Sequence, residues 1–155
     1  MENIKQILLC TLFFSVSLWS QNSQISIADL NLPKNKVAVE GYDLTTYFTQ
    51  DEPSKGSKKW QSNYKGVFYY FKNESNKLLF DANPDQYTPE FGGWCAYALG
   101  AFSKKVEIDP ESFTIEEGKL YLFFNGIFND TREKWLNDHD TLKPKAYSNW
   151  NTLIQ

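Results

Sequence analysis

Few side chains in this 155-residue sequence have the chemistry of a reactive centre. There are two cysteines, Cys10 and Cys95, and a single histidine, His139. Cys95 follows a glycine pair at the predicted start of a helix, where unpaired backbone N–H groups stabilise an anion and can lower the pKa of a thiol. Such a thiol could act as a nucleophile, a redox group or a soft metal ligand. Beside Trp94 and Tyr97 it could equally be a small buried hydrophobic residue.

Asp43 is a second candidate, and it lies near two tyrosines in the sequence, Tyr42 and Tyr47. Its carboxylate could cap the helix predicted after it, because such a side chain accepts hydrogen bonds from N–H groups two or three residues further on. It could instead act as an acid or base, or as a hard metal ligand that faces Cys95. One thiol makes an incomplete metal site, so Asp43, tyrosines, a partner or a second copy would have to supply the other donors.

His139 lies between two carboxylates, Asp138 and Asp140. Their negative charges would raise the pKa of the imidazole if they stay close to it. The polar sequence around the histidine favours an exposed loop near a helix end over a catalytic position.

The composition excludes several classes of protein. Two cysteines and one histidine are too few for a zinc ribbon or a multi-histidine metal centre. The net charge is −3 and the basic residues are scattered, so no basic face for nucleic acid is expected. The sequence has neither a phosphate-binding Walker loop nor a G-x-S-x-G nucleophile motif.

The N-terminus is typical of a secretory signal peptide. Lys5 precedes the uncharged run from Ile7 to Trp19, and a polar stretch follows from Ser20. The run is shorter than the roughly 20 residues that span a bilayer. We therefore expect a signal peptide at residues 1–20 and a periplasmic or secreted protein, with no membrane span after cleavage. Cleavage would remove Cys10, so no internal disulfide is possible.

The rest of the chain predicts a small α+β domain. A polar, flexible leader is expected at residues 21–36, a short strand at 37–39 and a helix at 44–48 capped by Asp43. Further helices are expected up to residue 82, at 84–87, at 94–99 with Gly100 as its end, and after Asp130 or Thr131.

Two antiparallel β-hairpins are expected between these helices. Residues 60–64 and 67–71 flank Lys65-Gly66, and residues 113–115 and 120–124 flank a turn that ends at Gly118. The two hairpins share only the glycine at the turn, and the sequence shows no internal repeat of solenoid length. Several short helices are expected to pack against them.

Three stretches together resemble the exported bacterial YHS domain proteins. They are Val39-Glu40-Gly41-Tyr42-Asp43 with Tyr47-Phe48, Tyr64-Lys65-Gly66 with Tyr70-Phe71, and residues 80–87 leading to Gly92-Gly93-Trp94-Cys95-Ala96. The resemblance implies a YHS-like domain over residues 37–153. Small YHS modules hold metals through cysteines, but the matching stretches here, 42–48 and 72–80, contain none. The resemblance therefore implies the fold and not that metal site.

Three hypotheses about function follow. The first is a non-enzymatic exported binding protein that holds a metal ion, such as copper, or a small ligand near Cys95. The second is a thiol-dependent redox protein that uses an accessible Cys95, with no second cysteine to resolve an oxidised intermediate. The third is a structural or partner-binding domain with an aromatic surface, since Phe, Trp and Tyr make up 17% of the chain.

Overall fold

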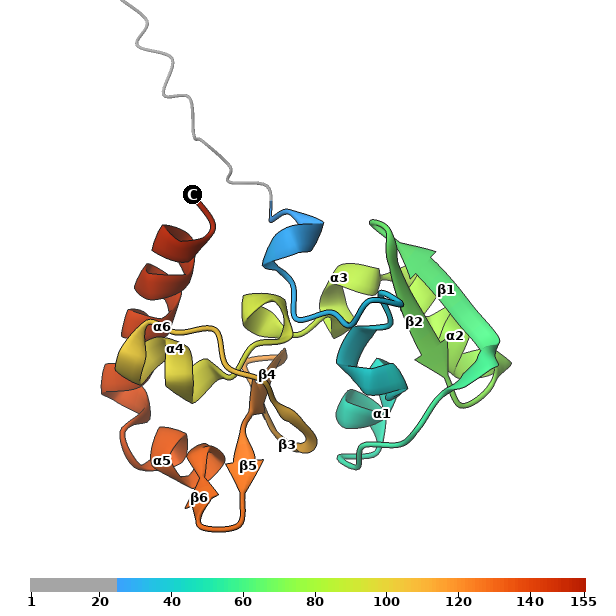
Figure 1. Ribbon diagram of the computed structural model, residues 1–155. Helices are drawn as coiled ribbons and strands as arrows, with labels where there is room; N and C mark the ends of the chain where they lie inside the picture. The colour runs from blue at the N-terminus through green and yellow to red at the C-terminus, as the bar shows by residue number, and fades with distance from the viewer. Residues whose placement is uncertain (1–24) are drawn as a thin grey trace, which may run out of the picture.

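A computed structural model describes residues 25–155 of the chain. The expected signal peptide, residues 1–20, and the first part of the expected leader lie outside the described residues. The described part is a small α+β domain with antiparallel strand pairs, which confirms the expected fold class. In Figure 1 the chain forms two groups of elements side by side, the first in cyan and green and the second in yellow to red.

The first group, unit 1, spans residues 38–87. It contains the 3-10 turn η2 (Ala38–Gly41), helix α1 (Leu44–Thr49), the hairpin β1 (Ser57–Tyr64) with β2 (Val67–Phe71), and helices α2 (Glu74–Ala82) and α3 (Pro84–Tyr87).

The second group, unit 2, spans residues 90–153. It contains the 3-10 turn η3 (Glu90–Gly93), helix α4 (Ala96–Phe102), the hairpin β3 (Asp109–Glu116) with β4 (Lys119–Phe123), the short pair β5 (Asn125–Gly126) with β6 (Asn129–Asp130), and helices α5 (Thr131–Asn137) and α6 (His139–Leu153).

The two hairpins are built alike at a constant spacing of 52 residues. Strand β1 begins at residue 57 and β3 at 109, while β2 begins at 67 and β4 at 119. Both pairs carry a register shift at the same place, between Ser57 and Gln61 in unit 1 and between Asp109 and Phe113 in unit 2. Such a bulge increases the local twist of a hairpin and is a specific structural feature, not a defect.

The 3-10 turns that open the units are also alike. Three consecutive residues have positive φ in each turn. In η2 they are Val39, Glu40 and Gly41, with φ of 44°, 51° and 78°. In η3 they are the residues 52 positions later, 91–93, with φ of 54°, 61° and 84°. Side chains other than glycine rarely adopt this left-handed region. Its recurrence at the same spacing identifies the second turn as a copy of the first.

The backbone hydrogen bonds that tie each unit together keep the same spacing. The Asp43 N–H donates to the Ser54 carbonyl at 2.8 Å, and the Cys95 N–H donates to the Val106 carbonyl at 3.0 Å. We conclude that the domain contains one structural unit twice, and the expectation that the two hairpins share only the glycine at the turn was wrong.

The repeat is hidden in the sequence because the side chains have diverged. Between residues 39 and 72 only four positions keep their residue 52 positions later. They are Gly41 and Gly93, Gly66 and Gly118, Tyr69 and Tyr121, and Phe71 and Phe123.

Each unit has its own hydrophobic core, organised around the inner face of its second strand. In unit 1, Phe80 of α2 packs on Tyr69 and Phe71 of β2, with ring centroids 4.7 and 5.0 Å away. In unit 2, Trp135 of α5 packs in the same way on Tyr121 and Phe123 of β4. The ring centroids lie 5.6 and 5.7 Å apart. The opposite face of β4, with Leu120 and Leu122, belongs to the core of unit 1 and so joins the two units.

Some local expectations need correction. Residues 37–39 do not form a strand, because the chain turns into η2 immediately after a single bridge between Val37 and Phe68. Helix α4 starts at Ala96 and continues through Gly100 to Phe102, where Ser103 takes the left-handed cap conformation in place of the glycine. The short pair β5–β6 was not foreseen.

The described part of the expected leader, residues 25–36, is bonded to the domain. The Asn31 N–H donates to the Gly92 carbonyl at 2.9 Å, and the Trp94 indole donates to the Asp29 carbonyl at 2.6 Å. The Lys105 ammonium lies 3.1 Å from the Asp29 carboxylate. These contacts are all with unit 2, while Leu30 and Leu32 pack against the core of unit 1. The segment therefore crosses the boundary between the two units, as the blue ribbon in Figure 1 shows.

Among the described residues, no helix combines the length and the apolar character needed to cross a membrane.

Candidate functional site

Asp43 is fully buried and its carboxylate is saturated with hydrogen bonds. As expected, it caps α1: Oδ1 accepts from the N–H of Thr45 at 3.0 Å and from its hydroxyl at 2.7 Å. Oδ2 accepts from the N–H of Lys72 at 2.8 Å and from the side-chain amide of Asn76 at 2.7 Å. The carboxylate therefore ties α1 to the end of β2 and to α2, which is a structural role.

Cys95 is the residue at the corresponding position of unit 2, and it is also fully buried. It lies at the N-cap of α4, and its Sγ accepts from the N–H of Phe124 at 3.3 Å. The Thr131 hydroxyl lies 3.5 Å from the same sulfur and donates to the Phe124 carbonyl. The thiol thus joins a helix start to the end of the hairpin, as Asp43 does in unit 1.

The structure does not bring Cys95 and Asp43 together. Each belongs to its own unit, and each bonds to the residue that follows its unit's second strand, Lys72 or Phe124. Within residues 25–155 no group of three or more His, Cys, Asp and Glu side chains is arranged to hold a metal ion. A copper or other metal site at these two residues stays a prediction that this geometry does not support.

The tyrosines near Asp43 have partners of their own. Tyr47 is 1% exposed and its hydroxyl donates to the Pro110 carbonyl at 2.8 Å, across the boundary between the units. The Tyr42 hydroxyl donates to Glu111 at 2.9 Å, and the Lys55 ammonium lies 4.1 Å from the centre of its ring. Burial, together with Glu111, raises the pKa of Tyr42.

The remaining candidates lie apart from one another in unit 2. Trp94 is half-buried against residues 25–36, and Tyr97 packs edge-on against Phe102. His139 is the first residue of α6, and its Nε2 lies 2.8 Å from a Glu116 carboxylate oxygen. It therefore lies at a helix start, where we had expected a loop near a helix end.

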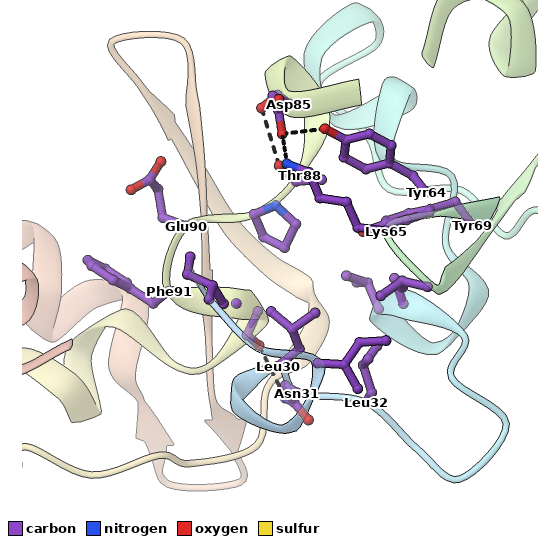
Figure 2. A pocket seen from close by; sticks show the side chains of 18 of the residues that line it. Leu30, Asn31, Leu32, Tyr64, Lys65, Tyr69, Asp85, Thr88, Glu90 and Phe91 are labelled. Carbon is purple, nitrogen blue, oxygen red and sulfur yellow. Dashed lines mark hydrogen bonds and ion pairs between the residues drawn. The ribbon is translucent and has the colours of Figure 1, made fainter. Parts of the chain in front are cut away.

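A cavity lies elsewhere, between the two units. It has a volume of about 680 Å³. Its walls come from unit 1, from η3 and the end of α6 in unit 2, and from residues 25–32 (Figure 2). The apolar lining consists of Ile25, Ile27, Leu30, Leu32, Ala38, Val39, Val67, Pro89, Phe91 and Trp150. We call this cavity the groove.

Tyr69 is the polar residue that stands out in the groove. Its side chain extends from β2 toward the space between the units in Figure 2, and only 7% of the residue is exposed. Burial raises the pKa of Tyr69 well above its ordinary value, so the phenol stays protonated. No described residue forms a hydrogen bond to its hydroxyl. Since no fully enclosed side-chain polar atom lacks a partner in the described part, this hydroxyl is not fully enclosed, and it belongs to a residue that lines the groove.

The other polar groups at the edge of the groove are already paired. Asp85 accepts hydrogen bonds from the Tyr64 hydroxyl at 2.9 Å and from the Lys65 ammonium at 3.0 Å, as the dashed lines in Figure 2 show. The Glu90 carboxylate accepts from the Tyr147 hydroxyl at 2.7 Å. A molecule in the groove would therefore meet an apolar wall, paired charges at the edge and one free hydroxyl.

Sequence reasoning did not find the groove or Tyr69. The strand 67–71 is apolar or aromatic at every position, which indicated that its second face is covered or lines a pocket, but not which residue would lack a partner. Residues 25–32, read as a flexible leader, supply part of the wall.

The aromatic surface expected by the third hypothesis is small. Phe128 is fully exposed at the tip of the β5–β6 pair, and its neighbour Ile127 is 93% exposed. Phe102 is 60% exposed, and the other aromatic rings of the described part are buried or half-buried.

A scan against protein-family models, a search of curated proteins and a search of solved structures found no match to this chain. The resemblance to exported YHS domain proteins therefore stays a prediction from the sequence.

Proposed function

We propose that this protein is a non-enzymatic binding protein that holds a small, mainly apolar ligand in the groove between its two units. The observation that carries the proposal is Tyr69, which lines an apolar groove and whose hydroxyl forms no hydrogen bond with any residue among 25–155. Buried polar groups in native proteins are nearly always paired, so an unpaired one in a cavity is a candidate contact for a ligand.

The size and lining of the groove support a small ligand. Ligand sites are typically clefts of about 300–1,000 Å³ with a mostly apolar wall and a few placed polar groups. The volume of about 680 Å³ lies inside this range, and Tyr69 would be the group that orients the ligand.

The geometry gives less support to a site at Cys95. The thiol is 0% exposed and its sulfur already accepts a backbone hydrogen bond, whereas a reactive cysteine is partly exposed in an electropositive environment. The described part of the chain also holds no second cysteine that could resolve an oxidised Cys95.

The proposal is tested by native mass spectrometry of the protein purified from its own host. We expect an added mass that is lost on denaturation, and lost as well in Thr88→Trp, because Thr88 lines the groove and an indole would fill it. Thr141→Trp, on the exposed side of α6, is the matched control and should keep the added mass. An added mass that persists in folded Thr88→Trp would contradict the proposal.

We also propose that the protein acts in the periplasm or outside the cell, on the strength of the N-terminal sequence at residues 1–20. Cell fractionation and the intact mass of the processed chain test this. A cytoplasmic protein that retains all 155 residues would contradict it.

A further inference from the structure

The repeat allows the groove to be compared with the same surface of unit 2, where the chain covers it with helix α6. The Tyr147 ring of α6 packs on Phe91, with centroids 4.9 Å apart, and its hydroxyl lies 2.8 Å from the Tyr121 hydroxyl. Nearer the hairpin turn, His139 and Lys143 of the same helix contact Glu116. Helix α6 packs mainly against α4, and these side chains of α6 reach η3, β4 and the end of β3.

The matching positions of unit 1 line the groove. Counting back 52 residues from Phe91, Tyr121 and Glu116 gives Val39, Tyr69 and Tyr64, and all three are lining residues. Unit 1 has no counterpart of α6 over most of this surface, because α3 ends at Tyr87 after a single turn whereas α6 runs for 15 residues. The groove is thus the unit 1 version of a surface that unit 2 covers with aromatic side chains.

The two versions differ in charge. In unit 2 the Tyr147 hydroxyl donates to the Glu90 carboxylate at 2.7 Å and accepts from the Lys119 ammonium at 3.2 Å. The positions that correspond to Glu90 and Lys119 in unit 1 are Ala38 and Val67, both buried and both in the groove wall. The shared tyrosine is retained, while both charged neighbours are replaced by aliphatic side chains.

We infer that the ligand is an uncharged ring compound with one hydroxyl or carbonyl group, which lies on Val39 and bonds to the Tyr69 hydroxyl as Tyr147 bonds to Tyr121. This inference rests on the proposed function and names the class of ligand. A charged group would lose its hydration against Ala38 and Val67 without gaining an unpaired counter-ion, since Lys65 is already paired with Asp85. A hydrocarbon ring without a polar group could not form a hydrogen bond with the Tyr69 hydroxyl.

The inference is tested with three probes that share one ring system: 2-naphthol, naphthalene and 2-naphthoate. Dissociation constants are measured from amide chemical shifts of the isotope-labelled full chain. We expect 2-naphthol to bind about fivefold more tightly than naphthalene, the effect of one net hydrogen bond, and 2-naphthoate to bind most weakly. In Tyr69→Phe the preference for 2-naphthol over naphthalene should disappear, while naphthalene binds as before.

The outcomes separate the two proposals. If the three probes bind in the groove with equal affinity, or 2-naphthoate binds best, the inference about ligand class fails and the proposed function stands. If none of them shifts the amides that line the groove, the proposed function fails with it. Tyr121→Phe, which removes the corresponding hydroxyl of unit 2, is the matched control and should leave the preference for 2-naphthol unchanged.

Discussion

Units 1 and 2 share one backbone arrangement and differ in the side chains that it carries. The hairpins have the same register and the same bulge, and the opening turns have the same left-handed residues. At the helix cap, unit 1 has a carboxylate, Asp43, and unit 2 a thiol, Cys95, yet each accepts an N–H from just beyond its second strand. Cys95 therefore occupies the structural position of Asp43, whereas Tyr69 lines a groove at the surface where its counterpart Tyr121 is bonded to Tyr147.

The largest expected effect comes from the cap of unit 1. Asp43→Ala should lower the free energy of unfolding by about 3–4 kcal/mol, because it leaves several buried donors without an acceptor. Chemical denaturation of both proteins measures the difference. Asp130→Ala removes the exposed cap of α5 and is the control, with an expected loss of about 1 kcal/mol. Equal losses for the two variants would show that Asp43 is an ordinary cap.

The left-handed turns offer the next test. Gly92→Ala should destabilise the protein by about 2 kcal/mol, because φ is +61° there and a Cβ would lie 2.9 Å from a Leu30 methyl group. Glu40→Gly, at the corresponding position of unit 1, relieves the same backbone strain and should change stability by less than about 1 kcal/mol. Thermal or denaturant unfolding gives both values. A larger loss of stability for Glu40→Gly than for Gly92→Ala would contradict the correspondence between the two turns.

The cap of unit 2 should be less sensitive than that of unit 1. Cys95→Ser should reduce stability by about 1–2 kcal/mol, because a smaller polar group replaces a buried sulfur that accepts one backbone hydrogen bond. In a chain without residues 1–20, Cys95 is the single thiol, and it should react with a thiol reagent only as fast as the protein opens. Fast reaction in the native state would revive the redox hypothesis.

The smallest expected effect distinguishes the two tyrosines. Tyr121→Phe should lose about 1 kcal/mol because its hydroxyl bonds to Tyr147. Tyr69→Phe should be neutral in the ligand-free protein, since no residue in the described part of the chain bonds to this hydroxyl. Parallel unfolding curves provide the measurement, and a comparable loss in Tyr69→Phe would mean that this hydroxyl is already satisfied.

Much of the local structure could be predicted from the sequence. Lys65-Gly66 and Gly118 marked both hairpin turns, and Asp43 and Asp130 were expected as helix caps. These features depend on residues near one another in the chain, whose effect on the backbone is local.

The site could not be predicted in the same way. Cys95 and Asp43 were considered because of their chemical types, but their burial and hydrogen bonds depend on Lys72, Phe124 and Thr131, which are distant in sequence. The repeat was invisible because its evidence lies in backbone conformation: Glu40 and Gly92 share a left-handed φ without sharing a side chain. The groove arises because α3 ends after one turn, whereas α6 continues over the corresponding surface of unit 2. This difference can be recognised only after the two units have been aligned.

The most direct test of this account is a map of amide chemical shifts during titration with 2-naphthol. We expect the largest changes at Val39, Val67 and Tyr69, with little change at Tyr121, the counterpart that α6 already covers. Changes concentrated around Cys95, or at Ile127 and Phe128 on the exposed tip, would contradict the assignment of the groove as the binding site.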